Sequence, residues 1–269
     1  MTDFFPAGRV LPHPVFHWHI VVSQGEILCV GGRPLLNELP VSLVEAVDTQ
    51  SVSHYLGEWR GQACGVHYLS SQVDLPGFEW RGLRSLLGVV DEPVFFLAGR
   101  AMQVVDWDLD HQFCGRCGLK TELHLQDRAR VCSQCHLAVY PRISPCVIML
   151  LTRGDECLLA RHSHHRHSLY TALAGFIEPG ENAEQAVARE AYEEVGLKIG
   201  STRYLGTQSW PFPGQLMIGY LAEVCGGTLT PDQDEIMEAR WFHRNRVPDI
   251  IPPAETLSGQ LIRTFIGMG

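Results

Sequence analysis

Short apolar runs separated by turn residues fill much of the first hundred positions. Residues 15–30, VFHWHIVVSQGEILCV, predict two strands joined at a turn over Gln24 and Gly25. Further strand-like runs follow up to Tyr68, and residues 97–109 are typical of a linking helix. The pattern therefore predicts a small β-rich domain over residues 1–105.

The second half of the chain mixes both periodicities. A helix is expected after Asn182, and another over residues 255–265. Strands are expected at 146–151, 157–161, 170–173, 203–209, 216–224 and 239–242. Strands and helices in this order predict a mixed sheet sandwiched between helices, in the α+β class, over residues 141–269.

Candidate functional residues are most concentrated in the segment 175–197, GFIEPGENAEQAVAREAYEEVGL. Glu190, Glu193 and Glu194 stand at i, i+3 and i+4, so on a helix they share one face. Like charges at this spacing repel, and a hard cation such as Mg²⁺ or Mn²⁺ would remove the repulsion. A divalent metal held by carboxylates is suited to hydrolysing phosphoric anhydrides. The alternative is a solvated acidic helix without a metal.

The residues around these acids favour a site. Gly175 and Gly180 bracket a loop, while Asn182 is suited to cap the helix and Gly196 to end it. Arg189 stands among the acids, where its guanidinium is expected to hold Glu193 or another carboxylate in orientation.

Four cysteines upstream follow the spacing C-x2-C-x14-C-x2-C, which is typical of zinc. Four thiolates leave no open coordination position, so we expect one structural Zn²⁺ within residues 106–140. Neither alternative, a disulfide or a redox Cys-x-x-Cys motif, explains why two matched cysteine pairs are present. The four ligands are Cys114, Cys117, Cys132 and Cys135. The other five cysteines are scattered and are expected to be free thiols: Cys29, Cys64, Cys146, Cys157 and Cys225.

The run Thr207-Gln-Ser-Trp-Pro-Phe-Pro213 places two aromatic residues between prolines. It predicts a stiff, extended segment whose rings, Trp210 and Phe212, stack on a nicotinamide or adenine base. The alternative is an ordinary packed loop.

Taken together, these motifs resemble the NADH pyrophosphatases, which are zinc-ribbon-containing Nudix hydrolases of the NAD-capped RNA hydrolase type. The segment 175–197 matches the Nudix box at every fixed position. The family segment S-Q-P-W-P-F-P-x-S-L-M is matched except at Thr207, Ser209 and Gln215. The resemblance implies a Nudix fold preceded by a zinc ribbon and a smaller N-terminal β-rich domain.

The resemblance also implies an activity: metal-dependent cleavage of the pyrophosphate bond of NAD(H) to AMP and nicotinamide mononucleotide, and removal of NAD caps from RNA. The alternatives are hydrolysis of another dinucleotide, such as ADP-ribose or a diadenosine polyphosphate, and a non-catalytic nucleotide sensor. The intact carboxylates of the box count against the sensor.

The resemblance assigns roles to individual residues. Glu235 joins Glu190, Glu193 and Glu194 as a ligand of Mg²⁺ or Mn²⁺, and the general base is Glu178, Glu194 or Glu235. Tyr140 reaches the substrate pocket from the partner subunit of a homodimer. The other residues expected at the substrate are Phe176, Gln208, Trp210, Phe212 and Ser258.

The formal net charge of −9 argues against generic nucleic-acid binding, which needs a positive field. Five arginines either form a local basic surface that contacts phosphates or are ordinary surface residues, and both alternatives stay open. They are Arg128, Arg130, Arg142, Arg161 and Arg166. The histidines at 162, 164, 165 and 167 predict a polar loop, with metal or substrate phosphate as alternatives.

Motifs that the sequence lacks narrow its possible functions further. There is no G-x-G-x-x-G, so NADH is expected as a substrate to be cut and not as a redox cofactor. No apolar run is long enough to span a membrane, and the start of the chain lacks a secretory pattern. We therefore expect a cytoplasmic protein without a membrane partner.

Overall fold

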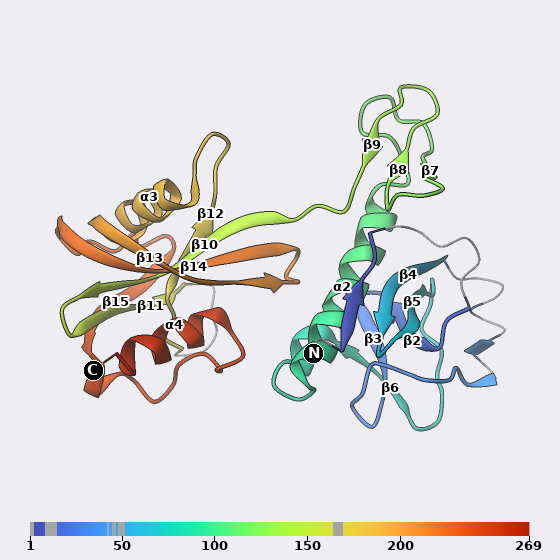
Figure 1. Cartoon of the computed structure of the whole chain (residues 1–269), viewed down its shortest axis with the longest axis horizontal. Helices are drawn as coiled ribbons and strands as arrows, with labels where there is room; N and C mark the ends of the chain where they lie inside the picture. The colour runs from blue at the N-terminus through green and yellow to red at the C-terminus, as the bar shows by residue number, and fades with distance from the viewer. Residues whose placement is uncertain are drawn as a thin grey trace. The chain divides into compact units, whose positions relative to one another are not determined.

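The computed structural model describes residues 3–8, 15–41, 43–44, 47, 52–163 and 169–268. The chain forms two compact units, Met1–Arg142 and Ile143–Gly269. Each unit has its own sheet and its own helix or helices, and Figure 1 shows them along the chain from blue to red.

The first unit contains a six-stranded sheet in the order β1-β4-β5-β2-β3-β6. Pairing is antiparallel except between β2 and β5. The expected hairpin is confirmed, because the turn between β2 and β3 places Gln24 and Gly25 at φ of 50° and 78°. The strands are β1 (Phe4–Pro6), β2 (Trp18–Ser23), β3 (Glu26–Val30), β4 (Val52–Trp59), β5 (Gln62–Tyr68) and β6 (Phe78–Gly82), which the 3-10 helix η1 (Leu83–Leu86) follows.

The expected linking helix is present as α2 (Glu92–Asp110) and begins earlier than its apolar pattern indicated. It leads into a three-stranded sheet of β7 (Glu122–Leu123), β8 (Arg130–Val131) and β9 (Ala138–Val139). Trp107 donates its indole N–H to the carbonyl of Val139 at 3.1 Å. Arg130 Nε donates to Asp108 Oδ1 at 2.8 Å, and both side chains are buried. These contacts fix the small sheet on the end of α2.

Two arginines proposed for a basic surface are instead internal. Arg128 is only 7% exposed and donates to the carbonyls of Ala7 and Tyr55 at 2.9 and 2.6 Å. Arg130 is 6% exposed. Because buried guanidinium groups keep their hydrogen bonds inside the protein, these two residues do not meet a ligand's phosphates. For Arg128 and Arg130 both alternatives drawn from the sequence were wrong.

The second unit is a mixed six-stranded sheet in the order β13-β14-β10-β11-β15, with β12 paired to β10. Strand β10 runs parallel to β14, and the other pairs are antiparallel. The strands are β10 (Ser144–Arg153), β11 (Glu156–His162), β12 (Leu173–Phe176), β13 (Leu197–Trp210), β14 (Gln215–Gly227) and β15 (Ile236–His243), and the 3-10 helix η2 (Arg244–Arg246) follows.

Alternation along β10 builds two cores. Val147 and Met149 belong to the cluster that α3 (Ala183–Val195) covers, whereas Ile148 and Leu150 belong to the cluster under α4 (Leu257–Ile266). The two helices therefore lie on opposite faces of the sheet, as Figure 1 shows. Burying each such side chain stabilises the fold by roughly 1.5–3 kcal/mol. The expected mixed sheet between helices is confirmed.

Two local expectations were wrong. The strand expected at 170–173 lies instead at β12, because β11 pairs only with residues 151–153 of β10 and leaves residues 146–149 to β12. The run around Trp210 is not extended throughout, since residues 211–214 form the turn that joins β13 to β14.

The three-part division at residues 105 and 140 stays a prediction. Among the described residues, no helix combines the length and apolar character that crossing a membrane requires.

Candidate functional site

Local interactions define both ends of α3. The Asn182 side chain accepts from the Gln185 backbone N–H, and the Gln185 side chain accepts from the Asn182 N–H, each at 2.9 Å. This reciprocal pair satisfies two of the N–H groups that a helix start leaves free. At the other end Gly196 adopts a left-handed conformation with φ of 71°. The predicted cap and the predicted stop are confirmed.

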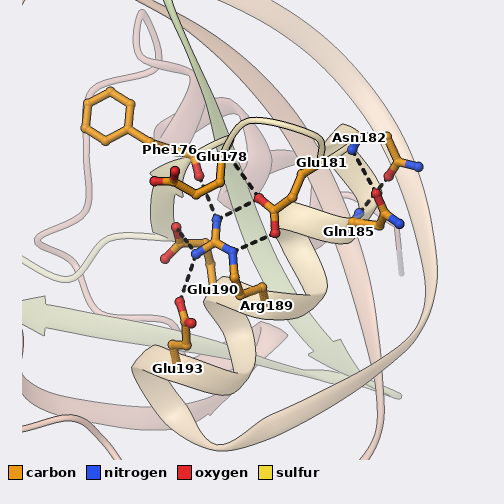
Figure 2. A network of polar contacts seen from close by, with 8 residues as sticks. All are labelled: Phe176, Glu178, Glu181, Asn182, Gln185, Arg189, Glu190 and Glu193. Carbon is orange, nitrogen blue, oxygen red and sulfur yellow. Dashed lines mark hydrogen bonds and ion pairs between the residues drawn. The ribbon is translucent and has the colours of Figure 1, made fainter.

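Arg189 lies at the centre of a polar network between α3 and the loop before it (Figure 2). Its Nε and Nη2 bind the two oxygens of Glu181 at 2.7 and 2.9 Å. Its Nη1 donates to Glu190 at 2.9 Å and to Glu193 at 2.8 Å, and Nη2 also donates to the carbonyl of Phe176. The guanidinium therefore fixes two of the three box carboxylates and the end of β12, as expected for its fork geometry.

Glu190 lies against β12 at Gly175. A Cβ atom at position 175 would stand 1.9 Å from the Glu190 carboxyl carbon, so a glycine is needed where this carboxylate approaches the strand. Burial raises the pKa of Glu190, partly offset by Arg189. The carboxylate is thus partly withdrawn from water and held in one direction.

Glu194 is the most deeply placed acid of the box. It is 4% exposed because it shares the sheet-facing side of α3 with Ala191 and Val187. Its Oε2 is buried without a hydrogen-bond partner. Burial, followed by repulsion from Glu190, Glu235 and Glu193, raises the pKa of Glu194 to about 8. A buried acceptor in this state is rare and is typical of functional sites.

The remaining acids line the more open side. The Glu193 side chain is 58% exposed, and Glu178 is exposed in the loop before α3. Glu235 ends the turn before β15, where its charge acts on both Glu190 and Glu194. The structure therefore brings Glu190, Glu193, Glu194 and Glu235 to one region.

This donor set fits a hard divalent cation. Carboxylate oxygens are the ligands that Mg²⁺ and Mn²⁺ prefer, and the unpartnered Oε2 of Glu194 needs a positive partner to be stable when ionised. Arg189 supplies only part of the compensating charge, since it contacts Glu190 and Glu193 but not Glu194.

The four predicted zinc ligands converge. Their Sγ atoms all lie within 4.8 Å of one another, with 3.4 Å between Cys114 and Cys135 and 3.5 Å between Cys117 and Cys132. Four thiolates about 2.3 Å from Zn²⁺ in a tetrahedron stand roughly 3.8 Å apart, so the cluster matches a closed zinc site.

Each pair of zinc ligands is followed by a residue in the left-handed region. Gly118 has φ of 77° after the first pair, and His136 has φ of 54° after the second. The N–H of Gly118 donates to the carbonyl of Cys114, and that of His136 to Cys132. The two tight turns therefore have the same form, as two matched knuckles require.

The predicted aromatic residues have different surroundings. Phe176 is 48% exposed, and Figure 2 shows its ring turned away from Arg189. Trp210 and Phe212 contact each other edge to face, with centroids 5.1 Å apart. Trp210 also packs against the core under α4. Their predicted stacking on a base stays a prediction.

Two predicted substrate ligands are internal. Gln208 donates to the carbonyl of Glu255 at 2.6 Å and accepts from the N–H of Leu257 at 2.8 Å. The Ser258 hydroxyl oxygen accepts from the N–H of Ala172 at 3.1 Å. Both side chains thus fix the start of α4, and their contact with substrate stays a prediction. Tyr140 is an exposed residue of the first unit.

Other candidates are only partly visible. Arg161 pairs with Glu238 at 3.5 Å, which also accepts from Tyr170. Arg142 is exposed at the end of the first unit. His162 ends β11, while His164, His165, Arg166 and His167 lie outside the described residues. The sequence analysis missed Glu181 as the bidentate partner of Arg189, although its position next to the helix cap gave a signal.

Three family models match successive parts of the chain. They are the NADH pyrophosphatase-like rudimentary NUDIX domain over residues 17–107, the NADH pyrophosphatase zinc ribbon domain over 109–140, and the NUDIX domain over 141–265. The zinc ribbon domain implies a structural Zn²⁺, which the four clustered cysteines fit. The Nudix domain implies a catalytic Mg²⁺ or Mn²⁺, which the carboxylates of the box fit.

Curated relatives match across most of the chain. The NAD-capped RNA hydrolase NudC of Stutzerimonas stutzeri is 42% identical over 78% of this chain and 76% of its own length. The protein of the same name from Pseudomonas syringae pv. tomato is 42% identical over 84% of this chain and 82% of its own length. With these relatives and domains, the chain belongs to the NudC family of zinc-ribbon Nudix hydrolases.

Proposed function

We propose that this chain hydrolyses the pyrophosphate bond of NAD(H) to AMP and nicotinamide mononucleotide, and that it removes NAD caps from the 5′ end of RNA. Two relatives named as NAD-capped RNA hydrolases support the substrate class. The run through Trp210 and Phe212, which resembles the NADH pyrophosphatase segment, also supports this class; it follows the box at the end of β13 and in the turn after it.

One observation carries the proposal: Glu194 is a buried carboxylate with an unpartnered oxygen, and the charges of Glu190 and Glu235 act on it. A protein that only needed stability would not collect like charges in a buried position. A divalent cation offsets this repulsion, so the arrangement is explained by metal-dependent chemistry.

The chain's own groups divide the work. Glu190, Glu193, Glu194 and Glu235 would hold Mg²⁺ or Mn²⁺, which when bound neutralises pyrophosphate charge and lowers the pKa of water. Arg189 keeps Glu190 and Glu193 oriented. Glu194, Glu235 or Glu178 accepts the proton of the attacking water.

The same proposal covers recognition. Phe176 offers an exposed ring at the end of β12 for stacking on a substrate ring. Tyr140 is exposed as well, and we propose that it completes the pocket of the partner subunit in a homodimer. A cytoplasmic location agrees with nine free cysteines, of which four are the zinc ligands.

Product analysis tests the proposal. Purified zinc-loaded protein would be incubated with Mg²⁺ or Mn²⁺ and, in parallel, NADH, ADP-ribose and NAD-capped RNA. We expect AMP and reduced nicotinamide mononucleotide from NADH, and none with EDTA. Faster cleavage of ADP-ribose than of NADH or capped RNA would contradict the assigned substrate, and no cleavage in any reaction would favour the nucleotide sensor.

A further inference from the structure

The turn that carries Glu235 is attached to α3 by its backbone. The N–H of Thr230 donates to the carbonyl of Val195 at 2.9 Å, and the N–H of Asp232 donates to that of Glu194 at 2.8 Å. These bonds use carbonyls that the end of a helix leaves free. They fix the beginning of the turn beside Glu194. Within the turn, the N–H groups of Glu235 and Ile236 donate to the carbonyl of Asp232 at 3.2 and 2.7 Å, and the far end is also held from β11.

Ser163 holds that far end. It is the first residue after β11, and its N–H donates to the carbonyl of Glu235 at 2.9 Å. Its hydroxyl donates to the carbonyl of Asp234 at 3.0 Å. One small residue therefore binds two consecutive carbonyls of the turn, immediately at the acidic side chain.

An irregularity in the sheet makes this arrangement necessary. Arg161 pairs with Glu238, whereas the next residue, His162, pairs with Ile236, so Met237 has no partner across the ladder. Such a bulge bends its strand and redirects neighbouring side chains, and bulges are common next to active sites. Beyond the bulge, His162 pairs with Ile236, and Ser163 extends the contact to the turn through its N–H and its hydroxyl.

The electrostatics oppose the observed position of Glu235. Glu235 lies near enough to Glu190 and Glu194 for its negative charge to act on both carboxylates. A mobile acidic turn would move away from two like charges when no cation is bound. The backbone must therefore hold Glu235 in place, and Ser163 is the side chain that does so from the β11 side.

We propose that Ser163 is a positioning residue of the catalytic metal site: it fixes the turn that brings Glu235 to Glu190 and Glu194. The inference rests on the proposed role of Glu235 as a metal ligand. Ser163 itself touches neither metal nor substrate, and it acts only through the orientation of that carboxylate.

Direct titration of Mn²⁺, followed by the loss of its free electron paramagnetic resonance signal, tests this without substrate. In zinc-loaded protein, Ser163→Ala removes the hydroxyl, and we expect Mn²⁺ affinity to fall about three- to tenfold. Ser163→Thr keeps a hydroxyl and should restore most of the affinity. Ser201→Ala is the matched control, since it removes a hydroxyl that binds Glu223 at 3.0 Å, in a contact that touches none of the site carboxylates.

A double-mutant cycle separates positioning from a general structural effect. Because Ser163 acts through Glu235, Ser163→Ala should cause no further loss of affinity in the Glu235→Gln background. Three outcomes would each overturn the proposal. Ser163→Ala could lose the same affinity in both backgrounds, or it could bind Mn²⁺ within twofold of wild type. The third outcome is a Ser163→Thr variant that binds Mn²⁺ as weakly as Ser163→Ala.

The cycle also keeps this inference apart from the proposed function. An unchanged Mn²⁺ affinity in Glu235→Gln would overturn the role of Ser163 whatever the enzyme cleaves. The expected order of affinities in a protein that cleaves no NADH would support the positioning role and overturn the proposed reaction.

Discussion

Glu194 on α3 and Asp108 on α2 are both buried carboxylates, 4% and 1% exposed, yet their surroundings differ. Asp108 accepts from Arg130 at 2.8 Å and from Gln112 at 3.2 Å, and His54 lies 3.5 Å away. Burial alone would raise the pKa of Asp108, but His54 and Arg130 outweigh it and lower that pKa. Burial raises the pKa of Glu194 to about 8, and the charges that act on it, those of Glu190, Glu235 and Glu193, are all acidic and add to this shift.

The comparison separates two uses of a buried charge. Asp108 is fully compensated by the protein, so it connects α2 to β8 and contributes to the folded structure. Glu194 is uncompensated by the protein alone, so its partner must come from outside. Burial is the same in both cases, and hydrogen-bond satisfaction distinguishes the structural acid from the functional one.

The largest expected effect comes from Glu194→Gln. The amide keeps the shape but cannot bind a metal as an anion or accept a proton, so we expect kcat for NADH to fall by about a thousandfold or more. The melting temperature should not decrease, because a poorly compensated buried charge is removed. A kcat within tenfold of wild type would show that Glu194 is not part of the machinery.

Asp108→Asn should have the opposite signature. Arg130 would remain buried without its counterion, so we expect the free energy of unfolding to fall by about 3 kcal/mol. The kcat of the folded enzyme should stay near wild type. Urea unfolding measures the first quantity, and NADH turnover at low temperature measures the second.

Asp3→Asn is the matched control for that variant. It breaks the exposed pair with Arg60, in which the side chains are 64% and 42% exposed. The change in the free energy of unfolding should be below about 1 kcal/mol. An equal loss in both variants would remove the distinction between a buried and a surface pair.

The two acids should also respond to pH in opposite directions. The folded-state pKa of Glu194 lies above its ordinary value of 4.5, so between these pH values the folded chain binds a proton that the unfolded chain releases. Without divalent metal, the free energy of unfolding should therefore decrease by about 2 kcal/mol from pH 6 to pH 8. The slope should shrink in Glu194→Gln and at saturating Mg²⁺.

Asp108 contributes in the acid range only. Its folded-state pKa is lowered, so its stabilisation is present above the ordinary value of 3.8 and is lost as the pH falls below that value. Comparing wild type with Asp108→Asn by urea unfolding from pH 5 down to pH 3 measures this. A difference that grew toward low pH would contradict the assigned sign.

A smaller effect on the site than that of Glu194→Gln is expected from Arg189→Lys. A lysine keeps the charge but cannot bind Glu181 through two parallel bonds while also holding Glu190 and Glu193. We expect Mn²⁺ affinity to fall about tenfold, with little change in stability. Arg203→Lys, on the exposed surface of β13, should leave the affinity unchanged.

What the sequence predicted well depends on short-range patterns. Each of these features involves residues that are close together in the sequence. They are the helix cap at Asn182, the helix stop at Gly196, the two cysteine pairs and the spacing of the carboxylates. Their geometry follows from helix and turn conformations alone, so the positions of Glu190, Glu193 and Glu194 on one helix could be predicted. The apolar run at residues 146–151 likewise predicted a strand, which is present as part of β10.

What it missed depends on distant partners. Arg128 binds the carbonyl of Tyr55, which is 73 positions away in the sequence, so no local pattern shows that its guanidinium is internal. The place of β12 is decided by which part of β10 the strand β11 leaves unpaired. Gln208 contacts the start of α4 from β13, and Ser258, in the first turn of α4, accepts from the N–H of Ala172, so both contacts join residues far apart in the sequence.

Gly175 has an evolutionary consequence. The three atoms nearest to a methyl group there belong to the carboxylate of Glu190, at the end of a side chain and not in the backbone, so we expect Gly175→Ala to fold with this carboxylate displaced. The displaced carboxylate would no longer face the metal. Selection for stability would therefore accept alanine at this codon, whereas selection for turnover would return glycine. A library randomised at position 175, selected once for stability and once for turnover, would show whether the two selections favour different residues.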